Sequence, residues 1–363
     1  MSAAEAFRCR GCRSPRGEVV LDLGDQPPAD HFPAANEPGP DPRHPLAMWW
    51  CSECGLAQLV DDTAVPDEPR AVEPRAAVLQ AHEAVDDLLA AGLLSPGEFL
   101  EFASPHGGSW SEALTTRGFT PAAGRRAGVV VDVYGLMHER DQRAGLQARA
   151  EALAEGGVLL LQFPTFAATL RHREWNALRH GHYAYHSVPA ARRLLADAGL
   201  QVIAARSWAL YGGSVLLVAT RTGARTAHAR AAVDALERDE IAVGVLDPAM
   251  MRPLSQAPAE DVAWLRDWVG RQAGGAWLYG AGSRAVAVLA AAGLADGAVT
   301  AIVDGAVAKH GRRMPGTSIP IVAPAALLVE EPAEVLLMLP DLLDELRDAW
   351  PAFGGRWVVY GAS

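Results

Sequence analysis

The chain has no long hydrophobic run, few cysteines and a shortage of basic residues, and each shortage excludes a class of protein. Its longest apolar run, around residues 158–161, is far below the roughly 20 residues that a membrane-spanning helix needs. The first residues, MSAAEAFRCRGCRS, lack the apolar core of a secretory signal. We therefore expect a cytoplasmic protein without a membrane partner, whose thiols stay reduced.

Basic residues are outnumbered by acidic ones. The 32 lysines and arginines stand against 43 aspartates and glutamates, which gives a formal net charge of −11. Binding to a phosphate backbone needs a basic face, so this balance argues against nucleic acid as a partner. Basic pairs at residues 125–126, 192–193 and 312–313 are interpreted as solvated surface.

Apolar residues, by contrast, are plentiful. Half of the 363 residues are hydrophobic, which excludes a mainly disordered chain, and the length favours two or three domains. From residue 98 onwards apolar strands alternate with helical stretches, and a second such alternation begins at 276, which indicates parallel sheets. We predict an α/β fold with a cysteine-rich head at 1–65, a Rossmann-like core at 66–225, and a helical connector with a second Rossmann-like domain at 226–363. A proline-rich linker at 66–75 would separate the first two parts.

The cysteines form two Cys-x-x-Cys pairs, Cys9 with Cys12 and Cys51 with Cys54. Each pair can present two thiolates to one tetrahedral metal, and together they complete a four-thiolate set. Such a closed shell leaves no open coordination position, so the predicted zinc is structural and not catalytic. Four ordinary buried thiols are the alternative, and chance rarely produces this spacing. A redox role is disfavoured because neither pair opens a helix in a thioredoxin-like unit.

The segments around the cysteines are more specific than their spacing. They read CRGC at 9–12, LDLGDQPPADHF at 21–32 and PLAMWWCSECGLAQL at 45–59, and they resemble the zinc-binding head of the three-domain sugar C-methyltransferases. The similarity continues through GLMHERD, GGVLLLQFP, HGHYAYHS, YGGSVLLVA and VDGAVAKHGRRMPGTSIPIVAP, in order along nearly the whole chain. The resemblance implies an enzyme of secondary-metabolite biosynthesis. It would transfer a methyl group from S-adenosylmethionine (SAM) to a ring carbon of a nucleotide-linked keto-deoxysugar.

Such a reaction needs a general base that removes a proton from the carbon next to the ketone. The resemblance implies four catalytic candidates: His182 as the base, with His180, Tyr185 and His138 supporting it. The sequence departs from the family at two neighbouring positions, where Gly181 replaces a glutamate and Arg179 a tyrosine. A structural role for the histidines stays open. So does a metal held by an i, i+2 histidine pair, for which no third ligand is evident.

The family holds SAM with an acid-bearing strand and a glycine-rich turn at a helix N-terminus. The matching candidates in this chain are Glu101, Gly107, Gly108 and Asp132. However, Ala103 stands at the position of the first glycine, and Pro105 removes a backbone donor. Only 25 residues, 104–128, separate the first strand from the next, although one βαβ unit takes about 30 residues. Because residues 117–128 also contain no acid, we predict that the ribose-binding carboxylate and at least one strand–helix unit are missing, which makes SAM a doubtful cofactor.

The C-terminal part offers candidates for binding the substrate. WLYGAGS at 277–283 resembles a dinucleotide turn, but Gly-x-Gly alone is a weak signal, and a packing turn that needs small residues is the alternative. Lys309 and Arg312 lie in a later loop that either meets a diphosphate or is a solvated basic loop. The resemblance adds His31, Phe32 and Ser187 to the substrate-binding candidates.

Three functions remain open. The first is a C-methyltransferase acting on a nucleotide-linked deoxysugar. The second is a repurposed enzyme on the same scaffold that uses no SAM and performs histidine-mediated proton transfer, such as epimerisation, elimination or cyclisation. The third is a non-catalytic partner protein. The family resemblance favours the first function, and the shortened sheet favours the second.

Overall fold

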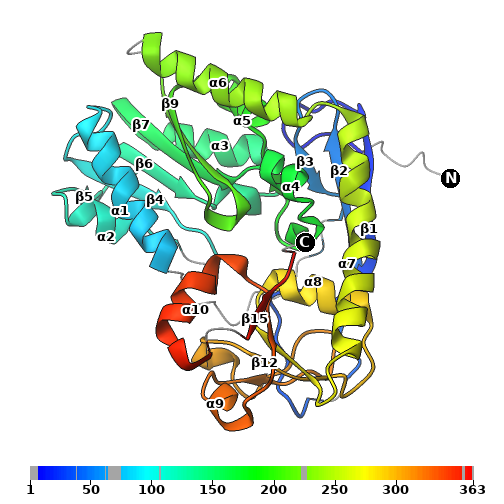
Figure 1. The fold of residues 1–363 in the computed structure, drawn as a ribbon. Coiled ribbons are helices and arrows are strands. Elements are labelled where there is room, and N and C mark those ends of the chain that lie inside the picture. Colours follow the sequence, from blue (N-terminus) through cyan, green and yellow to red (C-terminus); the bar gives the residue numbers. More distant parts are fainter. Residues whose placement is uncertain are drawn as a thin grey trace.

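Three β-sheets follow one another along most of the chain. The computed structural model describes residues 7–37, 39–61, 63, 75–105, 108–221, 227–353 and 356–361. Figure 1 shows the central sheet above and the C-terminal domain below, with the blue strands of the head alongside them. The predicted α/β class is therefore confirmed, whereas most of the predicted linker at 66–75 lies outside the described residues.

The head forms a four-stranded antiparallel sheet, for which the sequence analysis proposed no strands. In pairing order its strands are β1 (Gly17–Gln26), β2 (His44–Cys51), β3 (Ala57–Leu59) and β8 (Ala184–Tyr185). Strand β8 comes from the middle of the chain, so this sheet extends beyond residue 65. The last four residues of β2 are buried, and the indole nitrogen of Trp50 donates to the carbonyl oxygen of Val245 at 2.9 Å. This bond ties the head to the segment that leads into the C-terminal domain.

The central sheet has six strands, and one of them, β5, has only two residues. In pairing order it contains β5 (Thr120–Pro121), β4 (Glu98–Phe102), β6 (Ala127–Val133), β7 (Leu153–Pro164), β10 (Ser214–Thr220) and β9 (Gln201–Trp208). The first four strands are parallel, as predicted, but β10 runs antiparallel to both of its neighbours. The expectation of a purely parallel sheet was wrong here because only five residues join β9 to β10, and a parallel crossover needs about a dozen.

Helices cover both faces of the central sheet. Alternate valines of β6 point to opposite sides, so Val129 and Val131 pack with one apolar cluster and Val130 with another. The first cluster includes α1 (Arg75–Ala90) and α2 (Ser111–Thr115), and the second includes α3 (Gln142–Glu151) and α5 (Val188–Asp197). Helix α6 (Ala227–Val243) packs against α5 and β9. None of the helices in the described ranges is long and apolar enough to cross a membrane.

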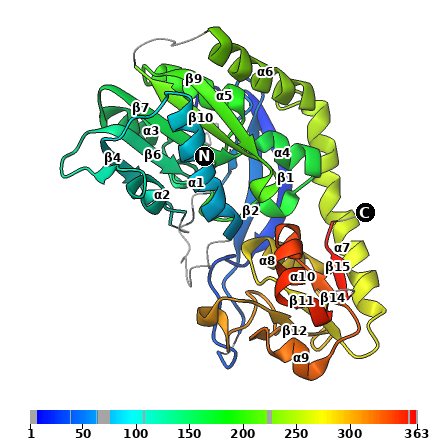
Figure 2. The same cartoon turned by 60° about the vertical axis from the view of Figure 1, so that its left-hand side comes forward.

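The C-terminal sheet is entirely parallel, as predicted. In pairing order it contains β13 (Ile321–Val322), β12 (Val299–Val303), β11 (Ala276–Tyr279), β14 (Val335–Leu337) and β15 (Trp357–Val359). Its helices are α8 (Ser283–Ala292), α9 (Ala326–Glu330) and α10 (Leu343–Ala349). The long helix α7 (Arg252–Gly270) packs on β1 and α8, so it joins this domain to the head (Figure 2).

A buried carboxyl connects three helices near the centre of the molecule. Glu240 of α6 is 2% exposed and accepts a hydrogen bond from the Thr165 hydroxyl, which caps helix α4 (Phe166–His172). It also accepts from the backbone nitrogen of Val188, the first residue of α5, at 2.5 Å. Burial raises the pKa of Glu240 to about 7, and the two hydrogen bonds offset only part of this effect.

Glu240 should therefore make the stability of the protein depend on pH. A pKa of about 7 in the folded chain, above the ordinary value of 4.5, favours the protonated carboxyl. The resulting stabilisation is complete below pH 4.5 and is lost as the pH rises through 7. Relative to E240Q, the wild type should lose on the order of 2 kcal/mol of unfolding free energy between pH 5 and 8, measured by urea titration. A difference that stays constant across this range would contradict the assignment.

Candidate functional site

The four cysteines meet in one cluster at the tip of the head. Their sulfur atoms all lie within 4.8 Å of one another, and the pairs Cys9–Cys54 and Cys12–Cys51 are each 3.6 Å apart. A tetrahedral zinc with Zn–S bonds of about 2.3 Å requires sulfur atoms about 3.8 Å apart. The residues therefore fit a structural zinc with four thiolate ligands.

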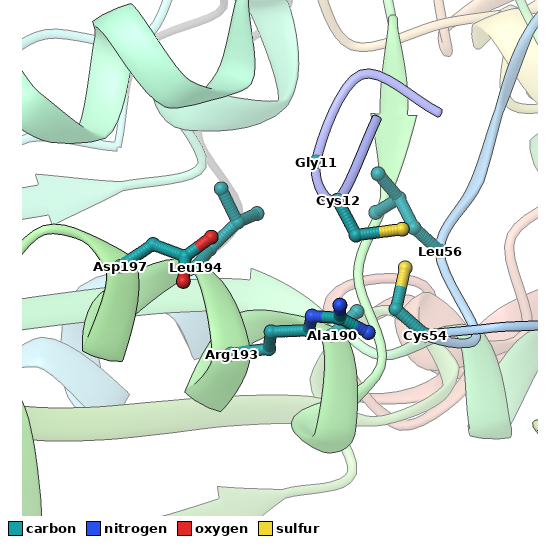
Figure 3. Close-up of a pocket in the computed structure, with 8 residues that line it drawn as sticks. All are labelled: Gly11, Cys12, Cys54, Leu56, Ala190, Arg193, Leu194 and Asp197. Carbon is teal, nitrogen blue, oxygen red and sulfur yellow. The ribbon is translucent and has the colours of Figure 1, made fainter. Parts of the chain in front are cut away.

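A small pocket lies between this cluster and helix α5. Figure 3 shows the side chains of Cys12 and Cys54 on the head side, with Arg193 and Asp197 of α5 on the other. Its remaining lining residues are Gly11, Leu56, Ala190 and Leu194. The head is thus seated directly on the central domain, through the segments that hold the cysteines.

The head also positions the histidine-rich segment at 179–187. Within this segment, β8 pairs with β3, and the register places Tyr185 opposite Ala57. The backbone nitrogen of Tyr183 donates to the carbonyl oxygen of Met137 at 2.8 Å. Met137 belongs to the 3-10 helix η1 (Leu136–His138), which follows the carboxyl end of β6. The segment is therefore held between the head and the carboxyl edge of the central sheet, where ligands of α/β sheets bind.

Two histidines come together at this edge. The ring centroids of His138 and His182 are 4.6 Å apart, with an interplanar angle of 84°. The Nδ1 atom of His138 lies 2.9 Å from the carbonyl oxygen of Gly181, which can only accept, so Nδ1 carries a proton in the neutral ring and Nε2 is the acceptor. Gly181 has φ +83°, a conformation that favours glycine over the family's glutamate. Its carbonyl oxygen thus orients the His138 ring.

His182 carries its proton on the opposite nitrogen. Nε of Arg179 lies 2.7 Å from Nε2 of His182, and because a guanidinium only donates, Nε2 must accept. Arg179 is in turn held by both carboxylate oxygens of Asp30, at 2.8 and 3.0 Å. Neutral His182 is therefore protonated at Nδ1. His138 therefore presents an acceptor at Nε2, and His182 presents a donor at Nδ1. The sequence analysis did not predict this arrangement.

The other candidates of this segment support its conformation. Tyr185 is buried, accepts from the backbone nitrogen of Arg179 at 3.0 Å and donates to a carbonyl oxygen at 3.1 Å, and burial raises its pKa. His180 is 5% exposed and lies 3.2 Å from the carbonyl oxygen of Pro45, with its pKa lowered by burial. Both are therefore oriented by the protein backbone.

Ser187 has a structural role in place of the expected contact with substrate. It is 0% exposed, its hydroxyl donates to the carbonyl oxygen of Gly55 at 3.1 Å, and it caps α5 by accepting from the Ala190 nitrogen. The neighbouring His186 is 2% exposed and contacts Gln142 Oε1 at 2.8 Å, and burial lowers its pKa to about 4. These two side chains fasten the segment to the head and to α3.

The acids expected to contact SAM are engaged elsewhere. Glu101, in β4, accepts from the Ser109 hydroxyl at 2.7 Å and from the Trp110 backbone nitrogen at 2.6 Å, so it holds the loop before α2. Asp132 is 0% exposed, pairs with Arg149 at 2.5 Å, and accepts from the backbone nitrogens of Gly135 and Leu136, just beyond β6. Burial raises the pKa of Asp132, although the charge of Arg149 lowers it. The expectation that Asp132 contacts the cofactor is therefore corrected, because a fully buried ion pair stabilises the sheet instead.

The glycine turn after β4 and the neighbouring strand β5 offer few groups that could bind SAM. Gly108 has φ +90° at the end of the turn, and Gly107 lies outside the described residues. Strand β5 has two residues, Thr120 and Pro121, and β6 pairs directly with β4. Because residues 117–128 contain no acid, none follows β5 to hold the ribose. The described residues of this edge therefore do not fit SAM as the family's turn holds it.

Four substrate-binding candidates lie where the head contacts the C-terminal domain. Lys309, the only lysine of the chain, is 3% exposed, and its ammonium lies 4.8 Å from the ring centroid of Phe32. It donates to the carbonyl oxygen of Ala281 at 2.7 Å. Arg312 donates to the carbonyl oxygen of Phe32 at 2.7 Å, and His31 is half-buried next to it. The loop, for which a diphosphate contact and a solvated basic surface were both expected, is therefore largely occupied in joining two domains.

Comparisons with known proteins agree with this arrangement. A family model described as a putative zinc binding domain matches residues 9–68, and one described as a C-methyltransferase C-terminal domain matches residues 209–360. The C-methyltransferase NovU of Streptomyces niveus is 28% identical over 255 residues, which cover 67% of this chain and 60% of NovU. The chain fits the sugar C-methyltransferase family. It spans less than two thirds of the length of this relative.

Solved structures match about two fifths of this chain. A SAM-dependent methyltransferase from Clostridium acetobutylicum is 10% identical, with a TM-score of 0.32, and covers 40% of this chain and 92% of its own. Magnesium protoporphyrin IX methyltransferase from Synechocystis, solved with bound SAH, is 13% identical, with a TM-score of 0.30, and covers 43% and 90%. Scores this low carry no information about the substrate or cofactor of this chain.

The stability of the head should depend on zinc. We expect about one zinc per purified chain and a fall in Tm on the order of 10 °C for C51S, because an incomplete ligand set no longer holds the two pairs together. Plasma emission spectrometry and thermal denaturation measure the two quantities. S52A is the matched control, since Ser52 is exposed between two ligands, and it should keep both. A metal-free, folded protein with four freely titrating thiols would refute the assignment.

Proposed function

We propose that this chain is a C-methyltransferase-type enzyme that removes a proton from the carbon next to the ketone of a nucleotide-linked deoxysugar. The observation that carries the proposal is the pairing of His138 and His182, with rings 4.6 Å apart and opposite tautomers. Enolisation needs a base for the carbon-bound proton and a donor for the oxygen that becomes negative. The two rings supply one of each.

In the proposed step, Nε2 of His138, which is buried in this structure, becomes accessible when the substrate binds and accepts the proton. The carbonyl oxygen of Gly181 stabilises the imidazolium through Nδ1. His182 donates from Nδ1 to the developing enolate oxygen, while Arg179 and Asp30 hold its ring. This exchanges the roles that the family resemblance suggests, in which His182 is the base.

The fate of the enolate distinguishes two candidate functions. SAM, if bound, would supply a methyl group to the nucleophilic carbon, as the family resemblance implies. The second candidate is proton transfer alone, ending in epimerisation, elimination or cyclisation of a biosynthetic intermediate. The two-residue β5 and the engagement of Glu101 with its own loop favour the second. Both candidates take a small-molecule substrate and share the same histidine pair.

Calorimetric titration with S-adenosylhomocysteine separates the two candidates. We expect no heat of binding at millimolar ligand, because the described residues offer no carboxylate for the ribose and Glu101 is already occupied. A dissociation constant in the micromolar range, weakened by E101A, would contradict this expectation and establish methyl transfer as the function.

Substitution of the histidine pair tests the shared step. With a nucleotide-linked keto-deoxysugar in deuterium oxide, H138A and H182A should each slow the exchange of the proton next to the ketone by about 10²–10⁴-fold, followed by NMR. H172A, a change at an exposed histidine of α4, is the control and should exchange at the wild-type rate. Exchange that is unchanged in H138A and H182A would remove the pair from the mechanism.

A further inference from the structure

A second polar cluster lies at the same edge of the central sheet and has no part in the proposed proton transfer. We call it the tyrosine–glutamine centre, and its members are Tyr134, Gln162, Ser214 and Gln80. Tyr134 follows β6, Gln162 lies near the end of β7, and Ser214 begins β10, so three neighbouring strands bring them together. The backbone nitrogen of Tyr134 donates to the carbonyl oxygen of Gln162 at 2.9 Å. Gln80 reaches the cluster from α1.

The backbone around the centre is strained. Tyr134 has φ +60° and Tyr211 has φ +57°, a region that residues other than glycine rarely adopt. The centroids of their rings are 5.4 Å apart. The surroundings impose the second conformation, because Arg284 donates to the carbonyl oxygen of Tyr211 at 3.1 Å and to Glu174 at 3.0 Å. Such strain persists where the structure over-determines it, and it clusters at functional sites.

Hydrogen bonds within the centre have a defined direction. The Ser214 hydroxyl donates to the carbonyl oxygen of Leu210 at 2.9 Å, so its oxygen accepts the phenolic proton of Tyr134 at 3.2 Å. The phenolic oxygen accepts from the amide nitrogen of Gln162 at 2.8 Å. The same nitrogen donates to Oε1 of Gln80 at 3.1 Å. The phenol is thereby held in a fixed orientation.

Two atoms of the centre are left over. Oε1 of Gln162 and Nε2 of Gln80 are buried, and neither has a hydrogen-bond partner among the described residues. The two side chains are 1% and 6% exposed. Exchanging the oxygen and nitrogen of both amides again leaves one donor and one acceptor. Buried polar groups that stay unpaired are costly, so a buried donor and a buried acceptor within one cluster call for bound groups that can donate and accept.

We propose that the tyrosine–glutamine centre binds a sugar hydroxyl of the substrate. A hydroxyl can donate to Oε1 of Gln162 or accept from Nε2 of Gln80, so it can satisfy either atom. The centre lies at the carboxyl edge that also carries the histidine pair, so a hydroxyl held there fixes the sugar ring relative to the ketone. This inference rests on the proposed function, because it assigns a specificity-determining subsite to the same substrate.

Calorimetry with UDP-glucose and UDP tests the proposal, since the difference between their affinities isolates the sugar. We expect wild type to bind UDP-glucose at least tenfold more tightly than UDP, and Q80L and Q162L to lose about tenfold for UDP-glucose only. Q26L is the matched control, because Gln26 is 6% exposed, has an unpartnered buried oxygen and lies in β1. It should keep the wild-type difference. Circular dichroism confirms folding, and Q80L, on an outer helix, keeps the test valid if Q162L fails to fold.

The proposal is overturned if wild type binds UDP-glucose and UDP equally well, or if Q80L keeps the wild-type difference between them. In either case, water is the only group that binds the two amides. If neither nucleotide binds, the nucleotide-linked part of the proposed function is wrong, and free D-glucose decides the subsite. Heat of binding in wild type that is lost in Q80L and kept in Q26L would support it, and no heat in wild type would overturn it.

Discussion

The meeting of four thiolates at the tip of the head determines where the histidines of the site lie. The cysteine pairs join the N-terminal knuckle to the end of β2, and β2 pairs with β3. Strand β3 in turn pairs with β8, which carries Tyr185 and follows His182. The sheet of the head is complete only with β8, which comes from the middle of the chain. The cysteine cluster and the histidine segment thus belong to one sheet, to whose folding energy a structural zinc would contribute.

Polar contacts between the C-terminal domain and the other two parts complete the arrangement. Arg313 pairs with both oxygens of Asp41 at 2.6 Å, and both side chains are less than 10% exposed, so the long loop after β1 is clamped to this domain. Arg284 connects the first turn of α8 to the strained Tyr211 beside the central sheet. The Gly-x-Gly turn of this domain is closed by Asp304, which accepts from the Ala281 nitrogen at 2.8 Å. Its small residues thus serve the packing of the domain.

Local patterns accounted for most elements of the two α/β regions and for the cysteine cluster. Valine-rich runs such as that of β6 are buried on both faces, and two Cys-x-x-Cys pairs carry a signal that needs no tertiary information. The head strands were missed because the segments around them are rich in proline and glycine, and because β3 pairs with a segment more than 120 residues away. Asp30 was also missed as the partner of Arg179, although it precedes a candidate histidine in the head.

By itself, the sequence determined the α/β class, the four thiolate ligands, the shortage of residues before β6 and the segment in which the histidines lie. Each of these follows from spacing or periodicity within a few dozen residues. Only the tertiary structure decided that His138 faces His182, that their tautomers are opposite, and that Asp132 and Ser187 are buried in structural roles. The reason is physical: a proton's position on an imidazole depends on which donor or acceptor lies within about 3 Å, and those partners come from distant parts of the chain.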